Sequence, residues 1–325
     1  MAKAVKIYTT GGPEVLKYED HDPGHPGPGE ALIRQDAVGL NFIDIYHRTG
    51  LYPLTGFPAI PGLEGAGVVE EIGEGVTEVR AGDRIAYAGL PLGAYAQVRL
   101  IPSHRLVRLP DKITMQQAAG MMLKGMTARY LLHGCYPLKA GDTILIHAAA
   151  GGVGSIVCQW ANHIGATVIG TVGSEEKAQT VQALGCHHPI LYNKQNFVDE
   201  VRRITGGGGV DVVYDSVGEA TFMQSMDCIR PMGTMVSFGQ SSGAVSPINT
   251  GLLAAKGSLF LTRPSLMTYT EKRDALVDHA EDLFSVVEGG QVRINVNRTY
   301  PLADVVKAHM DLEGRKTQGS TVLLP

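Results

Sequence analysis

The sequence predicts an α/β protein of two domains, a doubly wound parallel sheet and a β-rich domain. The chain has 325 residues, enough for two domains of ~150 residues each. Up to residue 124, strand-like runs are separated by Pro and Gly, and helical periodicity is rare. Beyond this point strands and helices alternate, and such alternation forms right-handed βαβ units in a parallel sheet.

The β-rich domain is expected to contain residues 1–124 and 295–325. The segment Val292–Pro325 is strand-like, so we expect it to return to this first domain. The earlier patterns are strands at Ala2–Tyr8, Ala31–Ala37, Gly67–Ile72 and Arg84–Tyr87, and a short helix at Phe42–Arg48.

The second domain is expected to contain residues 125–294. Its strand patterns are Thr143–His147, Thr167–Val172, His188–Tyr192, Val210–Ser216, Gly233–Phe238 and Leu259–Thr262. Helical patterns lead into these strands or connect them, at Met115–Leu132, Val153–Ile164, Ser174–Leu184, Phe197–Ile204, Glu219–Ile229 and Glu271–Glu288.

The composition excludes several classes of protein. Hydrophobic residues make up 44% of the chain and charged residues 18%, which excludes a disordered chain. The formal net charge of −4 argues against a nucleic-acid partner. Glycine contributes 41 residues without a three-residue period, so the glycines belong to turns and close backbone approaches, not to collagen.

The cysteines and the N-terminus favour a reduced, cytoplasmic protein without a membrane segment. Four cysteines lie singly, without the spacing of a zinc cage or a disulfide framework: Cys135, Cys158, Cys186 and Cys228. Met1 leads into Ala-Lys-Ala-Val-Lys with no apolar signal segment. The 32 residues from Thr143 to Ser174 lack Asp, Glu, Lys and Arg, but their six glycines fit a buried strand–loop–helix–strand better than a membrane span.

The strongest local signal is the segment His-Ala-Ala-Ala-Gly-Gly-Val-Gly that ends at Gly154. Ala149, Gly151 and Gly154 occupy the three positions of the G-x-G-x-x-G fingerprint, with Ala at the first. The segment follows a β run and opens a helix, where free N–H groups and the helix dipole bind a pyrophosphate. We expect a Rossmann-type dinucleotide site here; the alternative is a tight packing turn without a ligand.

The end of the following strand should select between NAD and NADP. NAD-binding chains place Asp or Glu about 20 residues further on, but Gly173 ends this strand without a carboxylate. Ser174 is expected to cap the next helix, and Lys177 lies in its first turn, where a bound 2′-phosphate would make a cation favourable. These features favour NADPH, whereas Glu175 and Glu176 count against it, and Lys177 is alternatively an ordinary surface lysine.

Four motifs occur in order: Asn41-Phe-Ile-Asp44, Pro61-Gly-Leu-Glu-Gly-Ala-Gly67, Gly82-Asp-Arg84 and the Ala-Ala-Gly-Gly-Val-Gly loop. With these motifs the chain resembles the medium-chain dehydrogenase/reductase superfamily over essentially its whole length. Within it, the chain is most similar to the zinc-independent quinone oxidoreductases of the zeta-crystallin-like branch. The resemblance implies a GroES-like catalytic domain for the β-rich part.

The chain departs from the zinc alcohol dehydrogenase pattern at two ligand positions. That pattern has a cysteine ligand where this chain has Asn41, and a histidine ligand where it has Leu63. The lobe of four cysteines that would follow Arg84 is also missing. An amide and a leucine cannot replace these ligands, so we expect no metal. The eleven histidines are most simply surface or strand-end residues.

The absence of zinc limits the chemistry that this chain can perform. A plain ketone needs a Lewis acid or a good proton donor, whereas a quinone or an α,β-unsaturated carbonyl delocalises the developing charge. The resemblance places Asn41, Tyr46 and Tyr52 beside the nicotinamide or the substrate cleft, as the expected catalytic hydrogen-bond donors. The two tyrosines could instead pack with outward hydroxyls. Asp44 is expected to orient Asn41 or the cofactor, or to cap the turn.

The resemblance implies further cofactor contacts near the strand ends. Thr127 and Tyr130 are expected beside the nicotinamide and the phosphates, Tyr192 and Lys177 beside the 2′-phosphate, and Lys316 as a phosphate partner. The full expected cofactor-binding set is Phe42, Asp44, Tyr46, Thr127, Tyr130, Gly151, Gly152, Val153, Gly154, Gly173, Ser174, Lys177, Tyr192, Ser216, Val217, Phe238, Gly239, Gln240, Ser241, Arg263, Pro264, Ser265 and Lys316.

We therefore expect a reductase that transfers a hydride from NADPH to a quinone or a similar conjugated carbonyl, without a metal. One alternative is an NADPH-dependent enone, enoyl-thioester or 2-alkenal reductase. An alternative of another class is a nucleotide-binding, crystallin-like or RNA-associated protein without turnover. Leu259–Thr262 is expected to be an edge strand that pairs with its twin in a homodimer, as the resemblance implies.

Overall fold

The computed structural model describes all 325 residues, which form two compact units. Unit 1 contains Met1–Met126, Tyr269–Glu288 and Ile294–Pro325, and unit 2 contains Thr127–Thr268 and Gly289–Arg293. The sequence predicts domain borders at 124/125 and 294/295, with all residues between them in one domain. In the structure, the borders fall two residues and one residue away from these positions, and residues 269–288 belong to unit 1.

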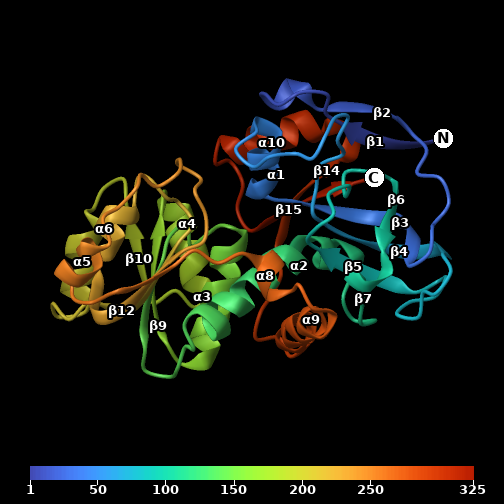
Figure 1. The fold of residues 1–325 in the computed structure, drawn as a ribbon. Coiled ribbons are helices and arrows are strands. Elements are labelled where there is room, and N and C mark those ends of the chain that lie inside the picture. The colour runs from blue at the N-terminus through green and yellow to red at the C-terminus, as the bar shows by residue number, and fades with distance from the viewer. The chain divides into compact units, whose positions relative to one another are not determined.

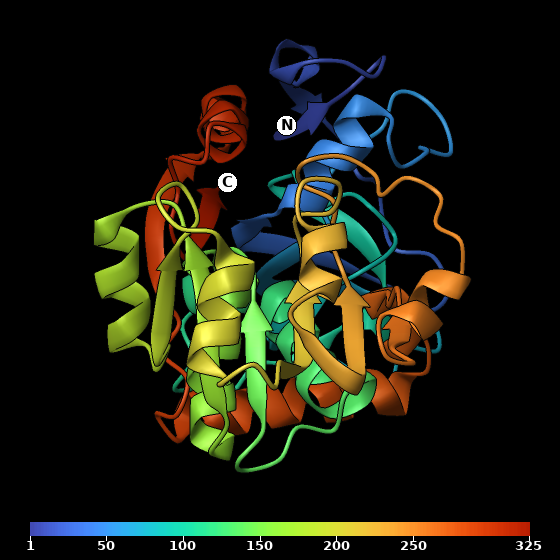
Figure 2. The ribbon, with the colours of Figure 1, turned by 90° about the vertical axis from the view of Figure 1, so that its left-hand side faces the viewer.

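A parallel sheet of six strands forms the centre of unit 2 (Figure 2). The strands lie in the order β10-β9-β8-β11-β12-β13, and every neighbouring pair is parallel. The first strand, β8, lies inside the sheet, and the chain winds outward from it in both directions, which confirms the doubly wound fold. The strands are β8 (Thr143–Ile146), β9 (Thr167–Val172), β10 (His188–Leu191), β11 (Val210–Asp215), β12 (Ile229–Ser237) and β13 (Phe260–Thr262).

Helices connect these strands and cover the sheet (Figure 1). Right-handed crossovers place α3 and α4 on one face and α5 and α6 on the other. Leu145, Ile169, Val213 and Met235 of the sheet pack in one core cluster with Phe197 of α5 and Phe222 of α6. The helices of this part are α3 (Gly152–Ile164), α4 (Glu175–Ala183), α5 (Phe197–Ile204), α6 (Phe222–Met226), α7 (Gly251–Ala255) and α8 (Leu266–Tyr269).

The long helix expected over Met115–Leu132 changes its pitch within its last turns. The α-helix α2 spans Met115–Arg129 and continues as a π-helix over Tyr130–Cys135. In unit 2 the hydroxyl of Tyr214, on β11, donates to the carbonyl oxygen of Leu131 at 3.1 Å. Wide turns of this kind occur frequently at functional sites.

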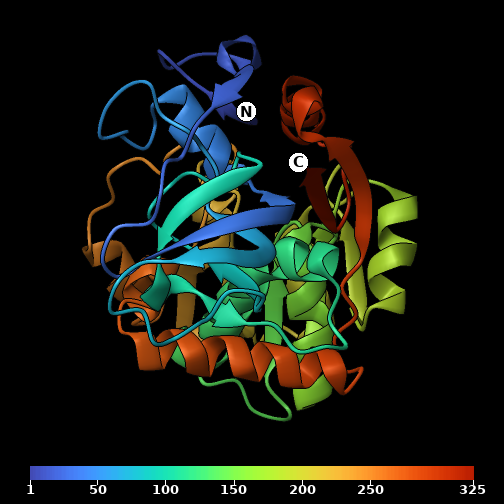
Figure 3. The same ribbon diagram turned by 90° about the vertical axis from the view of Figure 1, so that its right-hand side faces the viewer.

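Unit 1 is built on a sheet whose strands pair antiparallel, except that the C-terminal strand β15 pairs in parallel with β14. The strand order is β14-β15-β3-β4-β5-β7, with β6 also paired to β3, and β1 and β2 form a separate pair. Thr321 of β15 lies opposite Leu40 of β3, so the C-terminal segment returns to this unit as expected (Figure 3). The strands are β1 (Ala2–Lys6), β2 (Lys17–His21), β3 (Glu30–Leu40), β4 (Glu64–Ile72), β5 (Arg84–Ala88), β6 (Val98–Pro102), β7 (Val107–Arg108), β14 (Val296–Pro301) and β15 (Ser320–Leu324).

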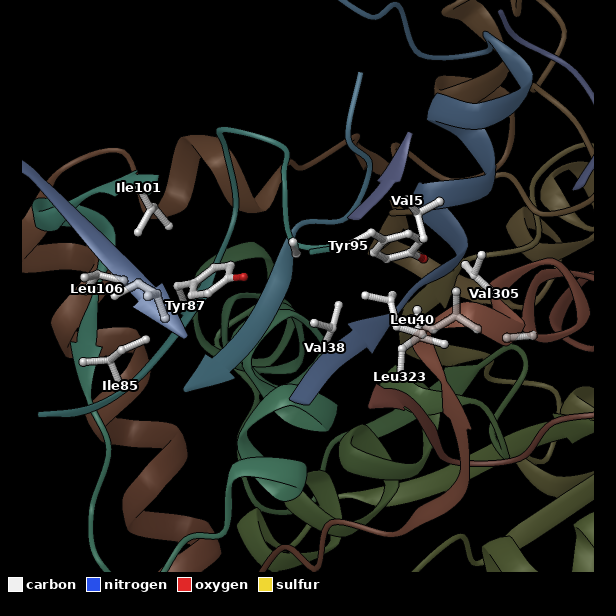
Figure 4. Packing of buried hydrophobic residues seen from close by; sticks show 14 of the residues in the cluster. Val5, Val38, Leu40, Ile85, Tyr87, Tyr95, Ile101, Leu106, Val305 and Leu323 are labelled. Carbon is white, nitrogen blue, oxygen red and sulfur yellow. The ribbon is translucent and has the colours of Figure 1, made fainter. Parts of the chain in front are cut away.

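The core of unit 1 brings both ends of the chain together (Figure 4). Val5 and Leu40 from the N-terminal part pack in one cluster with Val305 and Leu323 from the C-terminal part. Tyr95, which is fully buried, belongs to the same cluster and carries a hydroxyl group into it. The two helices beside this core are α1 (Phe42–Thr49) and α10 (Val305–Glu313).

Two expected elements are wrong in extent. The segment Val292–Pro325 is not strand throughout, because α10 lies between β14 and β15 and buries Val305 and Ala308 in the core. The helix expected over Glu219–Ile229 is reduced to the five residues of α6, because the preceding residues form a turn and Ile229 already begins β12.

The helix α9 (Arg273–Glu288) packs in unit 1 through identifiable bonds. The Arg273 guanidinium donates to the carbonyl oxygens of His104 at 2.7 Å and Leu106 at 3.0 Å. A Cβ atom on Gly125 would collide with Leu283, so α9 and α2 approach each other closely. Among all the helices, none combines the length and the apolar content that a bilayer crossing requires.

Candidate functional site

The small-residue turn after β8 has the geometry that binding of a diphosphate requires. Ala148 adopts φ 52°, and the Gly151 N–H donates back to its carbonyl oxygen at 2.8 Å. Gly151 then caps α3. A Cβ atom on Gly154 would overlap the Ala148 oxygen, so glycine is required for this close approach.

The N-terminus of α3 is suited to an anion. The first N–H groups of a helix have no acceptor within the helix and lie at the positive end of its dipole. The first turn of α3, which begins at Gly152, contains no acidic residue. Gly151, Gly152, Val153 and Gly154 therefore form one cradle, and the residues present fit a pyrophosphate.

The residues expected to select between NAD and NADP lie close together at the end of β9. A Cβ atom on Gly173 would lie 2.7 Å from the Tyr192 hydroxyl, so Gly173 and Tyr192 are in close contact. Ser174 caps α4 by accepting from the Lys177 N–H at 3.3 Å, which confirms the expected cap. Glu175, which counted against NADPH, forms an ion pair with Lys194 at 2.9 Å.

Two loops meet beyond β11 and β12. The N–H groups of Ser241 and Ser242 donate to the carbonyl oxygens of Ser216 and Val217, at 3.2 and 2.8 Å. A Cβ atom on Gly239 would lie 2.6 Å from the Ser216 oxygen. The structure therefore brings together the predicted residues of both loops, namely Ser216, Val217, Phe238, Gly239, Gln240 and Ser241.

The remaining predicted cofactor residues lie in several places. Arg263 follows β13 and donates to the carbonyl oxygen of Ser237 at 3.0 Å, so it lies at the same edge of the sheet. Pro264 and Ser265 follow Arg263 directly. Three others lie elsewhere: Thr127 and Tyr130 are buried in unit 2, and Lys316 is exposed in unit 1, 3.8 Å from Asp311.

A buried network of hydrogen bonds, centred on Asp215, lies at the carboxyl ends of these strands. The two oxygens of Asp215 accept from the Val217 and Gly218 N–H groups and from the hydroxyls of Thr221 and Ser225, at 2.7 to 3.0 Å. Since the Ser225 hydrogen points to Asp215, the 2.9 Å contact from His147 Nε2 must be a donation to Ser225.

The other nitrogen of His147, Nδ1, then accepts from the Thr171 hydroxyl at 3.0 Å. Burial lowers the pKa of His147, in agreement with this neutral tautomer. The chain from Thr171 through His147 and Ser225 to Asp215 therefore joins the carboxyl ends of β9, β8 and β11. The hypothesis that the histidines are only surface or strand-end residues did not anticipate this role.

Unit 1 holds a second site, and its charged centre is Glu64. This carboxylate is fully buried at the start of β4. Its Oε2 accepts from Lys124 Nζ at 3.0 Å and from Asn41 Nδ2 at 2.7 Å, and its Oε1 accepts from the Leu123 N–H at 2.8 Å. The ammonium of Lys124 therefore supplies the positive charge beside Glu64.

No metal-binding set accompanies these residues. In all 325 residues, no group of three or more His, Cys, Asp or Glu side chains is arranged to hold an ion. Leu63, next to Glu64, is fully buried. Asn41 uses one of its amide hydrogens for Glu64, which leaves one N–H for other partners.

Asp44 lies on the first turn of α1, beside Asn41. Its Oδ2 accepts from the Asn41 N–H at 2.8 Å and from the Tyr95 hydroxyl at 2.9 Å. Its Oδ1 is buried and has no hydrogen-bond partner. Burial raises the pKa of Asp44 to about 7, against the bonds from Asn41 and Tyr95 and the charge of Lys124.

The predicted tyrosines form an aromatic cluster on α1 and the loop that follows it. The ring of Tyr46 lies 5.5 Å from that of Phe42 and 5.1 Å from that of Tyr52. The Tyr52 N–H donates to the Tyr46 carbonyl oxygen at 3.0 Å. The structure therefore gathers Asn41, Phe42, Asp44, Tyr46 and Tyr52 in one place in unit 1.

Sequence reasoning missed several residues of the hydrogen-bond networks around Glu64 and Asp44. Glu64 stood inside a quoted motif and Lys124 inside an expected helix, both without a role, and Tyr95 and His309 were not singled out. A signal for Lys124 was present, because it is a lone charge in the apolar run from Met121 to Met126. Such a lysine, once buried, needs a carboxylate partner.

Comparisons with known proteins agree with this geometry. Two family models match: the "Alcohol dehydrogenase GroES-like domain" over residues 27–111 and the "Zinc-binding dehydrogenase" family over residues 152–279. The chain is 49% identical to the quinone oxidoreductase of Pseudomonas aeruginosa and 47% identical to the 2-haloacrylate reductase of a Burkholderia species. These alignments cover 100% of this chain and 100% and 99% of the two relatives.

A solved structure matches as closely. The crystal structure of Escherichia coli quinone oxidoreductase complexed with NADPH superposes with a TM-score of 0.98 at 45% identity. The match covers 100% of both chains.

We expect Lys124→Met to lower the free energy of unfolding by about 3–5 kcal/mol, because it leaves the Glu64 carboxylate buried without a counter-charge. Adding Glu64→Gln should recover part of this loss. Urea unfolding measures both effects, with Lys112→Met, an exposed lysine of the same unit, as the control. Equal stability of Lys124→Met and the parent would contradict the ion pair.

The raised pKa of Asp44 predicts a pH-dependent stability. The folded chain keeps this proton up to about pH 7, whereas an unfolded Asp loses it near the ordinary value of 3.8, so stability falls as pH rises between these limits. Asp44→Asn mimics the neutral acid, so its stability relative to the parent should increase from about pH 5 to about pH 8. A constant difference in urea unfolding would show that Asp44 is ionised throughout.

Proposed function

This chain belongs to the quinone oxidoreductases of the medium-chain dehydrogenase/reductase superfamily, and we propose on this premise that it reduces quinones with NADPH and without a metal. The observation that carries the proposal is the set of partners around Glu64. Its charge is balanced by an ammonium and an amide, where a metal-dependent dehydrogenase would hold its ion.

The cofactor residues are proposed as follows. NADPH supplies the hydride when it is bound. Its pyrophosphate would lie on the cradle from Gly151 to Gly154, and its 2′-phosphate beside Ser174, Lys177 and Tyr192. Support comes from the structure of the E. coli relative, which was solved with NADPH. The other proposed contacts are Phe42, Asp44, Tyr46, Thr127, Tyr130, Gly173, Ser216, Val217, Phe238, Gly239, Gln240, Ser241, Arg263, Pro264, Ser265 and Lys316.

The chemistry needs only hydrogen bonds from the protein. A quinone spreads the incoming charge over its ring, so neutral donors suffice where a simple ketone would need a Lewis acid. Asn41 offers its second N–H, held in place by Glu64. The hydroxyls of Tyr46 and Tyr52 are the other proposed donors. Together they would orient the acceptor for transfer.

The second candidate function is reduction of a conjugated carbonyl. It is favoured by the full-length similarity to a protein named 2-haloacrylate reductase. A conjugated acid or enone delocalises charge into an enolate in the same way, and it would use the same donors.

The assembly that we propose is a cytoplasmic homodimer. The outer strand β13 pairs only with β12, and Phe260 is 64% exposed. Next to it, Leu261 is 38% and Met232 66% exposed. An apolar, unpaired edge of this kind is suited to pairing with a second copy of the chain. None of the four cysteines forms a disulfide, which is compatible with a reducing compartment.

Steady-state oxidation of NADPH should be fast with 1,4-benzoquinone or 9,10-phenanthrenequinone and slower with an alkenal or a 2-haloacrylate. Quinones accept the hydride more readily because the product is aromatic. Absence of quinone-dependent oxidation, together with turnover of the alkenal or the haloacrylate, would favour the second candidate.

Replacement of Lys177 by Ala should weaken NADPH binding on the order of tenfold, because one charge-assisted bond to the 2′-phosphate is lost. Binding of NADH, which lacks this phosphate, should not change. The dissociation constants of both cofactors test this, with Lys139→Ala at the opposite end of the sheet as control. Unchanged NADPH affinity would remove Lys177 from the site.

A charge in the β13 edge should separate the proposed dimer. Phe260→Lys is expected to give a monomer in light scattering, because two lysines would face each other across the pair of edges. Met223→Lys, at another exposed apolar side chain of unit 2, is the control and should remain dimeric. A monomeric parent protein would contradict the assembly.

A further inference from the structure

The turn that follows β10 contacts the end of β9 through three successive residues. A Cβ atom on Gly173 would lie 2.7 Å from the Tyr192 hydroxyl, so these two residues are in close contact. The side-chain amide of Asn193 donates to the Gly173 carbonyl oxygen at 2.9 Å. Lys194 Nζ lies 2.9 Å from Oε1 of Glu175. This turn therefore contacts the segment beside which the 2′-phosphate of NADPH is proposed to lie.

Backbone bonds hold this turn without help from the Lys194 side chain. The N–H groups of Lys194 and Gln195 both donate to the Leu191 carbonyl oxygen, at 2.8 and 2.9 Å. The Leu191 N–H donates in return to the side-chain oxygen of Gln195 at 3.0 Å. The Tyr192 N–H donates to the Val172 carbonyl oxygen at 3.2 Å. The ammonium group of Lys194 is not needed to form the turn, so what it contributes is a charge at this place.

The ion pair between Lys194 and Glu175 adds little to the stability of the fold. The two side chains are 66% and 64% exposed. Exposed ion pairs contribute little because water weakens the attraction and because the ordering of two long side chains costs entropy. The pair does, however, change the electrostatic potential at the start of α4, where both side chains are accessible to a ligand.

The charges at the start of α4 are unfavourable for a phosphate unless Lys194 is included. Glu175, Glu176 and Lys177 give the first turn one negative charge in excess. Carboxylates suit the empty helix, because they lie at the positive end of its dipole. A phosphate monoester carries about −1.5 to −2 charges near pH 7, and Glu175, directly after the Ser174 cap, would repel it. The ammonium of Lys194 offsets the charge of this glutamate.

We propose that Lys194 is a specificity-determining residue, because its pairing with Glu175 cancels the negative charge that would keep a 2′-phosphate away from the start of α4. The inference rests on the proposed position of that phosphate beside Ser174, Lys177 and Tyr192. Lys177 would contact the phosphate, whereas Lys194 acts through Glu175. NADH carries a hydroxyl group in place of the phosphate, so its binding does not depend on either lysine.

The dissociation constants of the whole protein for NADPH and NADH, measured by calorimetry at low salt, test this inference. Lys194→Ala should weaken NADPH binding on the order of threefold to tenfold, because Glu175 then faces the phosphate without its partner. Lys194→Arg keeps the charge and should bind NADPH as the parent does. Lys194→Glu changes the charge by two units, so its factor should be about the square of the alanine factor. Binding of NADH should be the same in all of them.

Replacement of the partner supplies the other half of the test. Glu175→Gln should strengthen NADPH binding by a similar factor, and Glu175→Gln combined with Lys194→Ala should return to the affinity of the parent. In ~1 M salt, where the Debye length is about 3 Å, the differences between the variants should disappear. A double variant as weak as Lys194→Ala would contradict the inference, because Lys194 would then act without Glu175.

Arg203→Ala is the matched control for Lys194→Ala. Arg203 is also an exposed cation of unit 2 in an ion pair, with Glu200 at 2.7 Å. Its charge acts on His188, the first residue of β10, whereas Lys194 follows the end of this strand. Its replacement should leave the dissociation constants of both cofactors unchanged.

Lys177→Ala separates a failure of this inference from a failure of the proposed phosphate position. If Lys177→Ala weakens NADPH binding and Lys194→Ala does not, the phosphate lies here and the inference about Lys194 is wrong. If neither variant has an effect, the phosphate lies elsewhere and both proposals are overturned. Equal weakening of NADPH and NADH by Lys194→Ala would indicate a displaced turn and would also contradict the inference.

Discussion

The buried charge of Glu64 is the constraint on which the polar site of unit 1 depends. A carboxylate without access to water is tolerated only when its partners offset the loss of hydration. Lys124, Asn41 and the Leu123 N–H do so here, and they come from α2 and from the start of α1. One charge therefore fixes the relation of three elements and the orientation of the Asn41 amide. No ion is required to hold these parts together.

Unit 2 also contains a buried carboxylate that its hydrogen-bond partners stabilise. Asp215 is a buried carboxylate that is saturated by backbone N–H groups and hydroxyls, and His147 extends its network to the end of β9. This network stiffens the carboxyl ends of three strands, where a doubly wound sheet binds its ligands. The turn between β8 and α3, which lies at these strand ends, offers backbone N–H groups to a ligand.

Local patterns predicted the regular parts of this chain well. The helix and strand patterns predicted α5 and β9 with their observed bounds, and the glycine spacing predicted the turn before α3. They did not predict α10, because apolar residues alternate with polar ones from Val306 to Leu312, a period of two that is typical of a strand. They also did not assign α9 to unit 1, since an amphipathic helix does not specify which surface covers its apolar side.

The site was predictable where a motif stands in one continuous segment, and not where it depends on distant pairs. Asn41, Tyr46 and Tyr52 lie within twelve residues of one another, and the family resemblance pointed to all three. The partners Glu64 and Lys124 are separated by 60 residues, and nothing in either segment identifies the other. The bond between Tyr95 and His309 spans 214 residues, so it emerges only when β15 returns beside β3.

The claim that this site works without a metal can be tested by one measurement, the single-turnover rate of NADPH oxidation by a quinone after exhaustive dialysis against a strong chelator. The account predicts the same rate before and after dialysis, since Lys124 provides the fixed positive charge beside Glu64. A rate that is lost on dialysis and restored by Zn²⁺ would contradict it.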